Sequence, residues 1–384
     1  MRTLIVHNFY RHRGGEDRTV EVECTALAKA GIEVETHFSD SRDLEGRGAI
    51  GLGLETVWSR RAAAALEAKI AATRPDIVHF HNVFPLPSAA ALRAAKNAGR
   101  AVVRTLHNYR TLCANGLLLR QGRPCELCLE TKLPWPALRH ACYRERRDAT
   151  FAVAAANLVQ SAQRRRTDPV DRYVALSDFA AAKFRAAGYD PARLSVVPPI
   201  LADPGSPPDA ERTGFLWVGR LSPEKGLDVL AAALGDSDLA LEVVGDGPLA
   251  AKLRATAPPT WRWRGELAAD GVARAMRASA VLLFPSSAYE NFGLTLAEAM
   301  ANGMAIVASD RGASAEMLAG GAGLLVPPDD PPAWREAIEA LERDRTRVAA
   351  LGAKARARFE AEYAPARATA RRLDLYRELL AGAR

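Results

Sequence analysis

Two glutamates, Glu290 and Glu298, have the type and spacing of a ligand-binding pair. Their segment, residues 286–303, reads SSAYENFGLTLAEAMANG and predicts a loop followed by a helix, with Glu290 in the loop and Glu298 in the helix. Carboxylates placed in this way can accept hydrogen bonds from sugar hydroxyl groups, and the loop amides can turn toward an anion. The alternative is that both are surface charges at a helix start, where acidic residues are favoured in any protein.

A second motif, GRLSPEKG at residues 219–226, carries Arg220 and Lys225 between an expected strand and an expected helix. The helix start supplies N–H groups and partial positive charge, and the two side chains supply full charges, which together suit a diphosphate. A capped turn with a solvated arginine and lysine is the alternative.

Four of the five cysteines fall within thirty residues, at Cys113, Cys125, Cys128 and Cys142. The central pair has the C-x2-C spacing of a zinc knuckle, and the outer two can complete a structural tetrahedral site in a loop that needs ordering. His140 can replace Cys142 as the fourth ligand. Buried free thiols and a disulfide formed after lysis are the alternatives.

The elements that must position these residues alternate between short apolar, β-branched runs and helical patterns, which predicts repeated βα units and parallel sheets. The expected strands are 3–8, 33–37, 77–81, 101–106, 173–176, 194–197, 215–219, 239–244, 261–263, 281–284, 305–308 and 323–326. The expected helices include 16–30, 60–73 and 89–98, with further starts near Gly226, Pro248, Thr295 and Pro332. From 340 to 380 the pattern is helical with one break at Pro365.

Five prolines between residues 198 and 208 interrupt this alternation and predict an interdomain linker. We expect a first domain at 1–199 with a cysteine-containing insertion at 108–145, a linker at 200–212, a second domain at 213–360 and a C-terminal helix at 361–384. Ligands of open parallel sheets bind beyond the carboxyl ends of the strands, so a cleft between the domains is the expected site.

The chain has 384 residues and a net charge of +7, and the positive excess lies wholly in the first half. Residues 1–200 carry +10 and residues 201–384 carry −3. This bias favours an anionic partner, which is a membrane surface, a pyrophosphate-bearing substrate or nucleic acid, and a solvated arginine-rich surface is the alternative. No apolar run is long enough for a membrane span or a secretory signal, so we expect a cytoplasmic protein.

The string YENFGLTLAEAMANG, with GRLSPEKG upstream and VVGDGPL between them, resembles the retaining glycosyltransferases of family 4, which have the GT-B fold. The resemblance is close over residues 215–327 and looser in the first half, where the Gly14-Gly15-Glu16 turn and the segments DIVHFHN and TLHNYR also fit. It implies an α/β protein of two Rossmann-like parallel-sheet domains facing a cleft, with a C-terminal helix that crosses back to the first domain. The first domain would bind the acceptor and the second the nucleotide-sugar.

The resemblance also implies roles for single residues. Arg220 and Lys225 would hold the donor diphosphate and stabilise the leaving group, Glu290 would contact the transferred sugar, and Glu298 would bind the ribose. Backbone groups of Asn291, Phe292, Gly293 and Leu294 would share the binding of the diphosphate. The turn that contains Gly245 and Gly247 and the strand edge that contains Arg264 would frame the nucleotide, the latter near its base.

In the first half, the resemblance places His107 in the cleft, where the family's histidine contacts the donor sugar near the reaction centre. Gly14 and Gly15 would let the backbone approach a ligand closely, and a flexible surface loop is the alternative. His79 and His81 alternate along a neighbouring expected strand, so at least one of them should face the interior.

The implied reaction is retaining transfer of a sugar from a nucleoside-diphosphate sugar to a glycan or lipid-linked acceptor, without a catalytic metal. Surface polysaccharide or glycolipid synthesis at the inner face of a membrane fits the charge bias. A GT-B sugar-nucleotide epimerase or phosphorylase and a transferase to a soluble small molecule are the alternatives of the same fold. A dinucleotide-dependent oxidoreductase lacks its G-x-G-x-x-G after the first strand, and a zinc-stabilised nucleic-acid-binding protein lacks a base-reading motif, so no nucleic-acid partner is expected.

Overall fold

The computed structural model describes residues 1–207 and 212–382, and the chain divides into two compact units. The first unit, here the N-domain, comprises Met1–Leu118, Cys125–Leu201 and Pro365–Arg384. The second, here the C-domain, comprises Leu119–Pro124 and Ala202–Ala364. Residues 208–211 of the expected linker lie outside the described residues, and residues 200–207 form neither helix nor strand.

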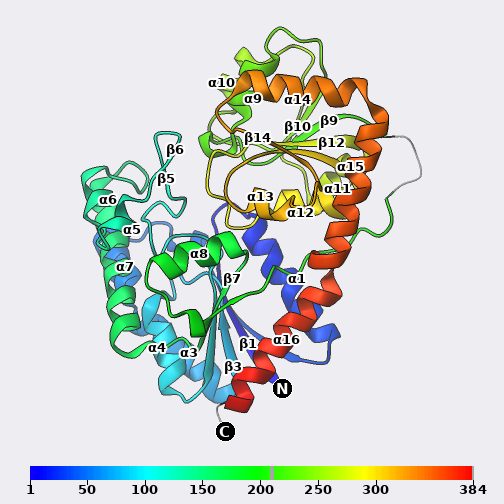
Figure 1. Ribbon diagram of the computed structural model, residues 1–384. Helices are drawn as coiled ribbons and strands as arrows, with labels where there is room; N and C mark the ends of the chain where they lie inside the picture. Colours follow the sequence, from blue (N-terminus) through cyan, green and yellow to red (C-terminus); the bar gives the residue numbers. More distant parts are fainter. Residues whose placement is uncertain (208–211, 383–384) are drawn as a thin grey trace. The chain divides into compact units, whose positions relative to one another are not determined.

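The N-domain is built on a six-stranded parallel sheet with the order β2-β1-β3-β4-β7-β8 (Figure 1). Its strands confirm all six that the sequence predicts in the first half. They are β1 (Arg2–Phe9), β2 (Glu33–Asp40), β3 (Ile77–Phe80), β4 (Ala101–Thr105), β7 (Arg172–Ala175) and β8 (Leu194–Val196). The central strands β1, β3 and β4 are buried along nearly their whole length, as expected of a parallel sheet covered on both faces.

Helices cover this sheet, and two of them begin at a side-chain cap that the local sequence provides. Ser59 accepts a hydrogen bond from the N–H of Ala62 and starts one helix, and Ser177 does the same for Ala180 and starts another. The helices are α1 (Gly15–Lys29), α2 (Ala49–Val57), α3 (Arg60–Thr73), α4 (Ser88–Asn97), α7 (Arg147–Thr167), α8 (Asp178–Ala186) and α16 (Pro365–Gly382).

The last of these helices, α16, belongs to the core of the N-domain. Leu375 and Tyr376 are buried in one apolar cluster with Ile5, Val20 and Leu27 from β1 and α1. Helices α1 and α16 also lie in contact. This agrees with the C-terminal helix that the family resemblance implies, which returns to the first domain.

The cysteine-containing insertion at 108–145, here the cysteine segment, contains four short elements. Strands β5 (Leu119–Arg120) and β6 (Arg123–Pro124) pair antiparallel, and the helices α5 (Leu127–Glu130) and α6 (Trp135–Arg139) follow them.

The C-domain repeats the architecture on a second six-stranded parallel sheet, with the order β11-β10-β9-β12-β13-β14. Its strands confirm the remaining six predicted ones: β9 (Thr213–Val218), β10 (Leu241–Val244), β11 (Arg262–Gly265), β12 (Ser279–Phe284), β13 (Ala305–Ser309) and β14 (Leu324–Val326). The helices are α9 (Leu227–Leu234), α10 (Ala250–Thr256), α11 (Ala269–Ala278), α12 (Leu294–Ala301), α13 (Ala313–Met317), α14 (Pro331–Arg343) and α15 (Arg345–Arg358). Trp217 and Trp334 are buried in the core that these elements enclose.

The prediction of one break between 340 and 380 is wrong, because the chain also breaks at Asp344. The side chain of Asp344 accepts a hydrogen bond from the N–H of Arg347, and so caps the start of α15 immediately after α14 ends. In the sequence alone, Asp344 lies between charged residues and could not be distinguished from a solvent-exposed residue within a helix. A short π-helical turn, Phe359–Tyr363, then precedes Pro365.

Over residues 1–207 and 212–382, none of the helices is both long and apolar enough to cross a bilayer.

Candidate functional site

Three loops at the carboxyl ends of β9, β10 and β12 interlock in the C-domain. Gly226 lies in the left-handed region with φ of 65°, and a side chain there would overlap the backbone of Pro285 at the end of β12. The N–H of Ser287 donates to the carbonyl of Glu224 at 3.0 Å. The motif GRLSPEKG is therefore held directly against the loop that carries Glu290.

The turn after β10 is held against the same motif. The N–H of Leu221 donates to the carbonyl of Asp246 at 2.9 Å, and Gly245 adopts a φ of 132°. A Cβ at Gly245 would overlap the carbonyl oxygen of Gly219, and one at Gly247 would lie 2.7 Å from the nitrogen of Leu221. Glycine is required at both positions because no side chain fits between the two loops.

The structure brings Lys225 and Glu290 into direct contact. Lys225 Nζ donates to Glu290 Oε1 at 2.7 Å, and Ser286 Oγ donates to the same oxygen at 2.7 Å. Burial on its own lowers the pKa of Lys225, but the charge and the hydrogen bond of Glu290 outweigh it, so the pKa is raised. The protonated lysine can bind an anionic group of a ligand. The adjacent carboxylate can accept a hydrogen bond from a hydroxyl group of the same ligand.

The residues between Glu290 and Glu298 form the entry to helix α12. Asn291 and Phe292 are buried, Gly293 is the N-cap, and the helix begins at Leu294. The first-turn amides of a helix lack partners within the helix, so this end offers donors and partial positive charge. Glu298 lies one turn further along the helix and is half-buried.

Arg220 and Arg264 occupy more open positions. Arg220 is exposed on the loop after β9. Arg264 is exposed on the edge strand β11, where its Nη1 lies 3.2 Å from Oε1 of Glu242. Arg220 thus lies on the same loop as Lys225. Arg264 forms a surface ion pair with Glu242.

The remaining predicted residues, Gly14, Gly15 and His107, belong to the N-domain. Gly14 is the exposed N-cap of α1, and its N–H donates to Oδ2 of Asp17 at 3.0 Å. The other oxygen of Asp17 lies 2.8 Å from Nε2 of the buried His7. The glycine turn therefore has a structural role as a helix start, fixed by an aspartate that sequence reasoning missed.

A small polar pocket opens beside His107 at the carboxyl ends of β3 and β4. Its lining includes Glu16, Asn82, His107 and Asn108. Glu16 accepts a hydrogen bond from the hydroxyl of Tyr10 at 2.8 Å. Burial raises the pKa of the Glu16 carboxyl, although the nearby His7 and the Tyr10 hydrogen bond act in the opposite direction.

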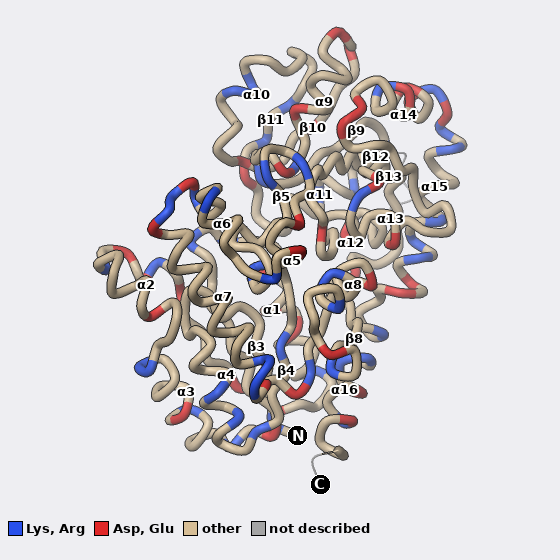
Figure 2. Tube along the Cα trace, turned by 60° about the vertical axis from the view of Figure 1, so that its left-hand side comes forward, with Lys and Arg blue, Asp and Glu red and all other residues tan. Residues whose placement is uncertain are grey.

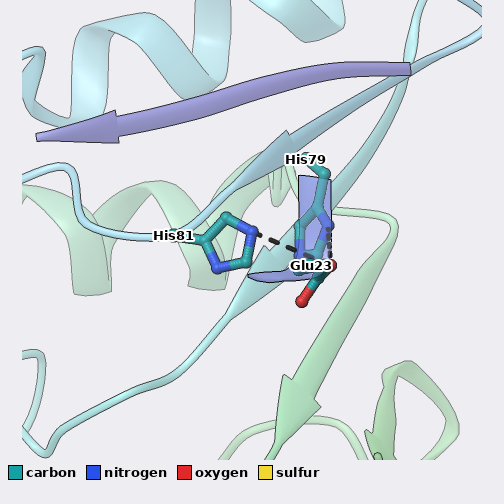
Figure 3. A group of neighbouring side chains, drawn as sticks. All are labelled: Glu23, His79 and His81. Atoms are coloured by element: carbon teal, nitrogen blue, oxygen red, sulfur yellow. Dashed lines mark ion pairs between the residues drawn. The ribbon is translucent and has the colours of Figure 1, made fainter. Parts of the chain in front are cut away.

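Glu23, His79 and His81 form a buried cluster (Figure 3), and His81 also lines this pocket. Both histidines are buried, which confirms the prediction that at least one of them faces the interior. Across the described ranges 1–207 and 212–382, this is the one group of three or more His, Cys, Asp or Glu side chains with donor atoms within 4.8 Å of each other.

The four clustered cysteines do not meet that spacing. Cys128 and Cys142 pack against a small apolar cluster around Ala137, and Cys113 is buried. Burial raises the pKa of the Cys128 thiol to about 12, with smaller contributions from the neighbouring thiols Cys113, Cys142 and Cys125. The described residues therefore hold no preassembled ligand set in this segment.

One Asp-x-Asp triplet, Asp236-Ser237-Asp238, is present in the chain. It follows α9 and precedes β10, so it lies at the amino ends of the strands, opposite to the loops described above, which follow the carboxyl ends. Asp236 forms an ion pair with Arg335 of α14.

Two parallel-sheet domains with interlocked loops at the strand ends define the class of this protein, which is GT-B. A family model described as Glycosyltransferase Family 4 matches residues 13–201, and one described as Glycosyl transferases group 1 matches residues 212–344. Together they span most of the chain. The chain belongs to this family of glycosyltransferases.

Solved structures show the same fold over the whole chain. Sucrose-phosphate synthase from Thermosynechococcus elongatus superimposes with a TM-score of 0.75 at 20% identity and covers 99% of both chains. Anabaena HepE in complex with UDP superimposes with a TM-score of 0.70 at 16% identity, over 98% of this chain and 100% of that one.

Curated relatives match over shorter segments. A GDP-mannose-dependent alpha-mannosyltransferase of Mycolicibacterium smegmatis is 39% identical over 114 residues, which are 30% of this chain and 29% of the relative. A phosphatidyl-myo-inositol mannosyltransferase of Mycobacterium leprae is 38% identical over 158 residues, or 38% of this chain and 42% of the relative. The chain thus aligns with less than half the length of these relatives.

Proposed function

We propose that this protein transfers a sugar from a nucleoside-diphosphate sugar to a glycan or lipid-linked acceptor, with retention of configuration at the anomeric carbon. The observation that carries the proposal is the contact between Lys225 and Glu290 on two interlocked loops of the C-domain. This contact puts a cation for the diphosphate beside a carboxylate for the sugar, and family membership supports both roles. The relatives named as mannosyltransferases make GDP-mannose the first donor to test.

In the proposed reaction, the bond between the anomeric carbon and the diphosphate oxygen breaks as a bond to the acceptor oxygen forms. The acceptor hydroxyl loses its proton to the departing diphosphate on the same face of the sugar. Lys225 and Arg220 stabilise the negative charge that grows on the leaving group, aided by the amides at the start of α12. Glu290 orients the sugar through its hydroxyl groups, and Glu298 binds the ribose.

We also propose that transfer needs no divalent cation. Lys225 is protonated and fixed by Glu290, so a positive charge is already in place for the diphosphate. The Asp-x-Asp triplet that could hold a cation lies at the amino ends of the strands, whereas Lys225 and Glu290 lie at the carboxyl ends. Its Asp236 is also paired with Arg335.

An exposed apolar patch supports the proposal of a lipid-linked acceptor and a peripheral place on the inner face of a membrane. The patch is formed by Ile50 and Leu54 of α2 and Phe151 of α7, which are 83%, 68% and 65% exposed. Helices α2 and α7 pack against each other, and a Cβ at Gly53 would lie 3.6 Å from that of Ala152. In Figure 2, Lys and Arg residues lie near these helices together with Asp and Glu residues.

Apolar side chains together with basic ones supply the two signals that reversible membrane attachment needs. We expect the double variant Ile50→Ser, Leu54→Ser to lose most co-sedimentation with vesicles that contain an anionic lipid. The matched control is Leu325→Ser, since Leu325 is an exposed leucine of the C-domain. Equal sedimentation of both variants would count against the patch, and a soluble acceptor would then be the better proposal.

A structural zinc ion in the cysteine segment remains a proposal, supported by the C-x2-C spacing of Cys125 and Cys128 and by the presence of Cys113 and Cys142 in the same segment. Zinc would draw the four sulfurs together and order the segment. Elemental analysis should then find about one zinc per chain. A metal-free protein whose cysteines all titrate with a thiol reagent under native conditions would contradict the site.

Thermal-shift titration tests the donor assignment. The protein is melted with UDP, GDP and their sugars, and a true ligand raises the midpoint in proportion to the logarithm of its concentration. The expected result is stabilisation by one nucleoside diphosphate and by its sugar, lost in Lys225→Ala. No shift with any nucleoside diphosphate would refute the proposed function.

A further inference from the structure

Three histidine side chains form a ladder in the interior of the N-domain. The ring centroids of His79 and His81 lie 4.3 Å apart, and those of His81 and His107 lie 5.1 Å apart. Nδ1 of His81 is 2.8 Å from Nε2 of His107, so one of these two nitrogens carries an N–H and donates a hydrogen bond to the other. Glu23 of α1 lies against the ladder, and both His79 and His81 face it in Figure 3.

The spacing of Glu23, His79 and His81 would suit a metal ion, but the surrounding charges do not. Nε of Arg372 lies 3.3 Å from Oε1 of Glu23, and its Nη2 lies 3.4 Å from Oε2. The Arg372 side chain is fully buried and already balances the carboxylate. Nδ1 of His79 is 2.7 Å from the hydroxyl of Tyr376. A divalent cation would stand beside a buried guanidinium, so the cluster is better described as a polar network.

Each imidazole of the ladder is uncharged near neutral pH. Burial, followed by the charge of Arg372, holds the pKa of His79 well below its ordinary value. Burial also lowers the pKa of His81 well below its ordinary value, and that of His107 to about 3. A neutral imidazole carries one N–H, so the position of that proton decides what the ring can donate or accept.

The groups that face His81 and His107 come from four elements. They are His7 of β1, Asp17 and Glu23 of α1, His79 of β3 and Arg372 of α16. Asp17 is engaged by His7 at 2.8 Å, and Glu23 is engaged by Arg372. Oε1 of Glu23 lies 3.3 Å from Nδ1 of His79 and 3.9 Å from Nε2 of His81, so Glu23 is the carboxylate that faces the outer nitrogen of His81.

We propose that Glu23, acting through His81, holds His107 in the neutral tautomer that carries its proton on Nε2. The carboxylate favours an N–H rather than a lone pair on Nε2 of His81. Nδ1 of His81 must then accept, so Nε2 of His107 must donate across the 2.8 Å contact. Nδ1 of His107 keeps its lone pair and is a hydrogen-bond acceptor. Glu23 and His81 are thus positioning residues, and they act through His107.

The consequence for substrate rests on the proposed function. His107 lines the polar pocket at the carboxyl ends of β3 and β4, and its predicted role is contact with the donor sugar. With Nδ1 as an acceptor, His107 would select a sugar that presents a hydroxyl group there, and it would disfavour a deoxy sugar at the same carbon. A site that accepts a hydrogen bond from a substrate hydroxyl discriminates strongly against an analogue that lacks it.

Nitrogen-15 NMR of histidine-labelled protein without substrate tests the tautomer directly, because the protonated and the unprotonated ring nitrogens differ in chemical shift. His107→Asn assigns the signals. We expect His107 in the wild type at pH 7.5 to show the proton on Nε2. A proton on Nδ1 of His107 would overturn the proposal. This measurement does not require activity, so it separates failure of the tautomer from failure of the proposed function.

The part played by Glu23 is tested with Glu23→Gln, Arg372→Met, which removes both buried charges together and avoids leaving one of them unpaired. We expect His107 to become a mixture of tautomers, and turnover to fall at least tenfold with unchanged nucleotide binding. Glu23→Asp keeps the carboxylate and should keep the tautomer, and Glu21→Gln, at an exposed position of α1, is the matched control. An unchanged tautomer in the double variant would refute the role of Glu23.

If the double variant does not fold, Arg372→Met is measured alone. The buried carboxylate that has lost its partner takes up a proton and becomes neutral, so the same loss of the tautomer is expected. Retention of the wild-type tautomer in a folded Arg372→Met protein would contradict the proposal as well.

Discussion

Replacing Gly226 by alanine measures how tightly the loops of the C-domain interlock. Gly226 has a φ of 65°, and an added Cβ would lie 2.9 Å from the carbonyl carbon of Pro285 and overlap its oxygen. The left-handed conformation costs an L-residue about 1–2 kcal/mol. Forcing the two loops apart costs a further ~1–3 kcal/mol, as in other overpacked sites.

Gly320 supplies the matched control, because it belongs to the same domain and has a φ of 76°, but no atom lies within 4 Å of its added Cβ. We therefore expect Gly320→Ala to lower the free energy of unfolding only by the about 1–2 kcal/mol that the left-handed conformation costs. Gly226→Ala should lose about 1–3 kcal/mol more, which is the cost of overpacking. Gly226→Ala should also weaken nucleoside-diphosphate binding, since Pro285 leads into the loop of Glu290.

Urea unfolding followed by tryptophan fluorescence is a suitable assay, because Trp217, Trp261 and Trp334 are buried in the C-domain. The free energy of unfolding is compared among wild type, Gly226→Ala and Gly320→Ala at constant m-value. An equal decrease in the free energy of unfolding in the two variants would show that the loop beside Pro285 can move away without an energetic cost. The reasoning about a rigid site would then be wrong.

Lys225→Ala and Glu290→Ala should each reduce turnover by roughly 100- to 1,000-fold, as expected for loss of a preorganised charge of about 3–4 kcal/mol. Both variants should keep the wild-type circular dichroism, and near-wild-type turnover in either would remove that residue from the site. Transfer should persist in excess chelator, whereas activity restored only by added magnesium or manganese would refute metal independence. The N-domain should lose stability as pH falls below about 6.5, because His79, His81 and His107 have lowered pKa values and the unfolded chain binds protons that the folded one does not. Three such groups give a slope of up to about 4 kcal/mol per pH unit, and a urea midpoint that does not change between pH 7.5 and pH 5.5 would contradict it.

The sheets could be predicted because the signal for a buried parallel strand is local. A short run such as Leu4–Val6 has to be apolar throughout, whatever lies around it. The loop carrying Glu290 was predictable for the same reason, since it follows such a strand and precedes a helix. Its contact with Lys225 was not predicted, because the two residues are 65 positions apart.

The polar network could not be predicted because its members come from distant parts of the chain. Glu23 and Arg372 are separated by 349 residues, and no pattern in either helix indicates that they are partners. The alternation of His79 and His81 was the one available signal. The exposed leucine and isoleucine of α2 were likewise hidden, since an apolar helix of nine residues is predicted to be buried unless its surroundings are known.

Helix α16 has a consequence for synthesis of the protein on the ribosome. The N-domain core needs Tyr376 and Leu375, and its buried Glu23 needs Arg372, yet all of the C-domain except Leu119–Pro124 is translated between Leu201 and Pro365. At about 5–20 residues per second, that interval lasts roughly 8–30 s. During this time the nascent N-domain holds an unbalanced buried carboxylate and an uncovered apolar surface, so it should be sensitive to protease on stalled ribosomes until α16 emerges. The first domain to be synthesised is therefore the last to be completed.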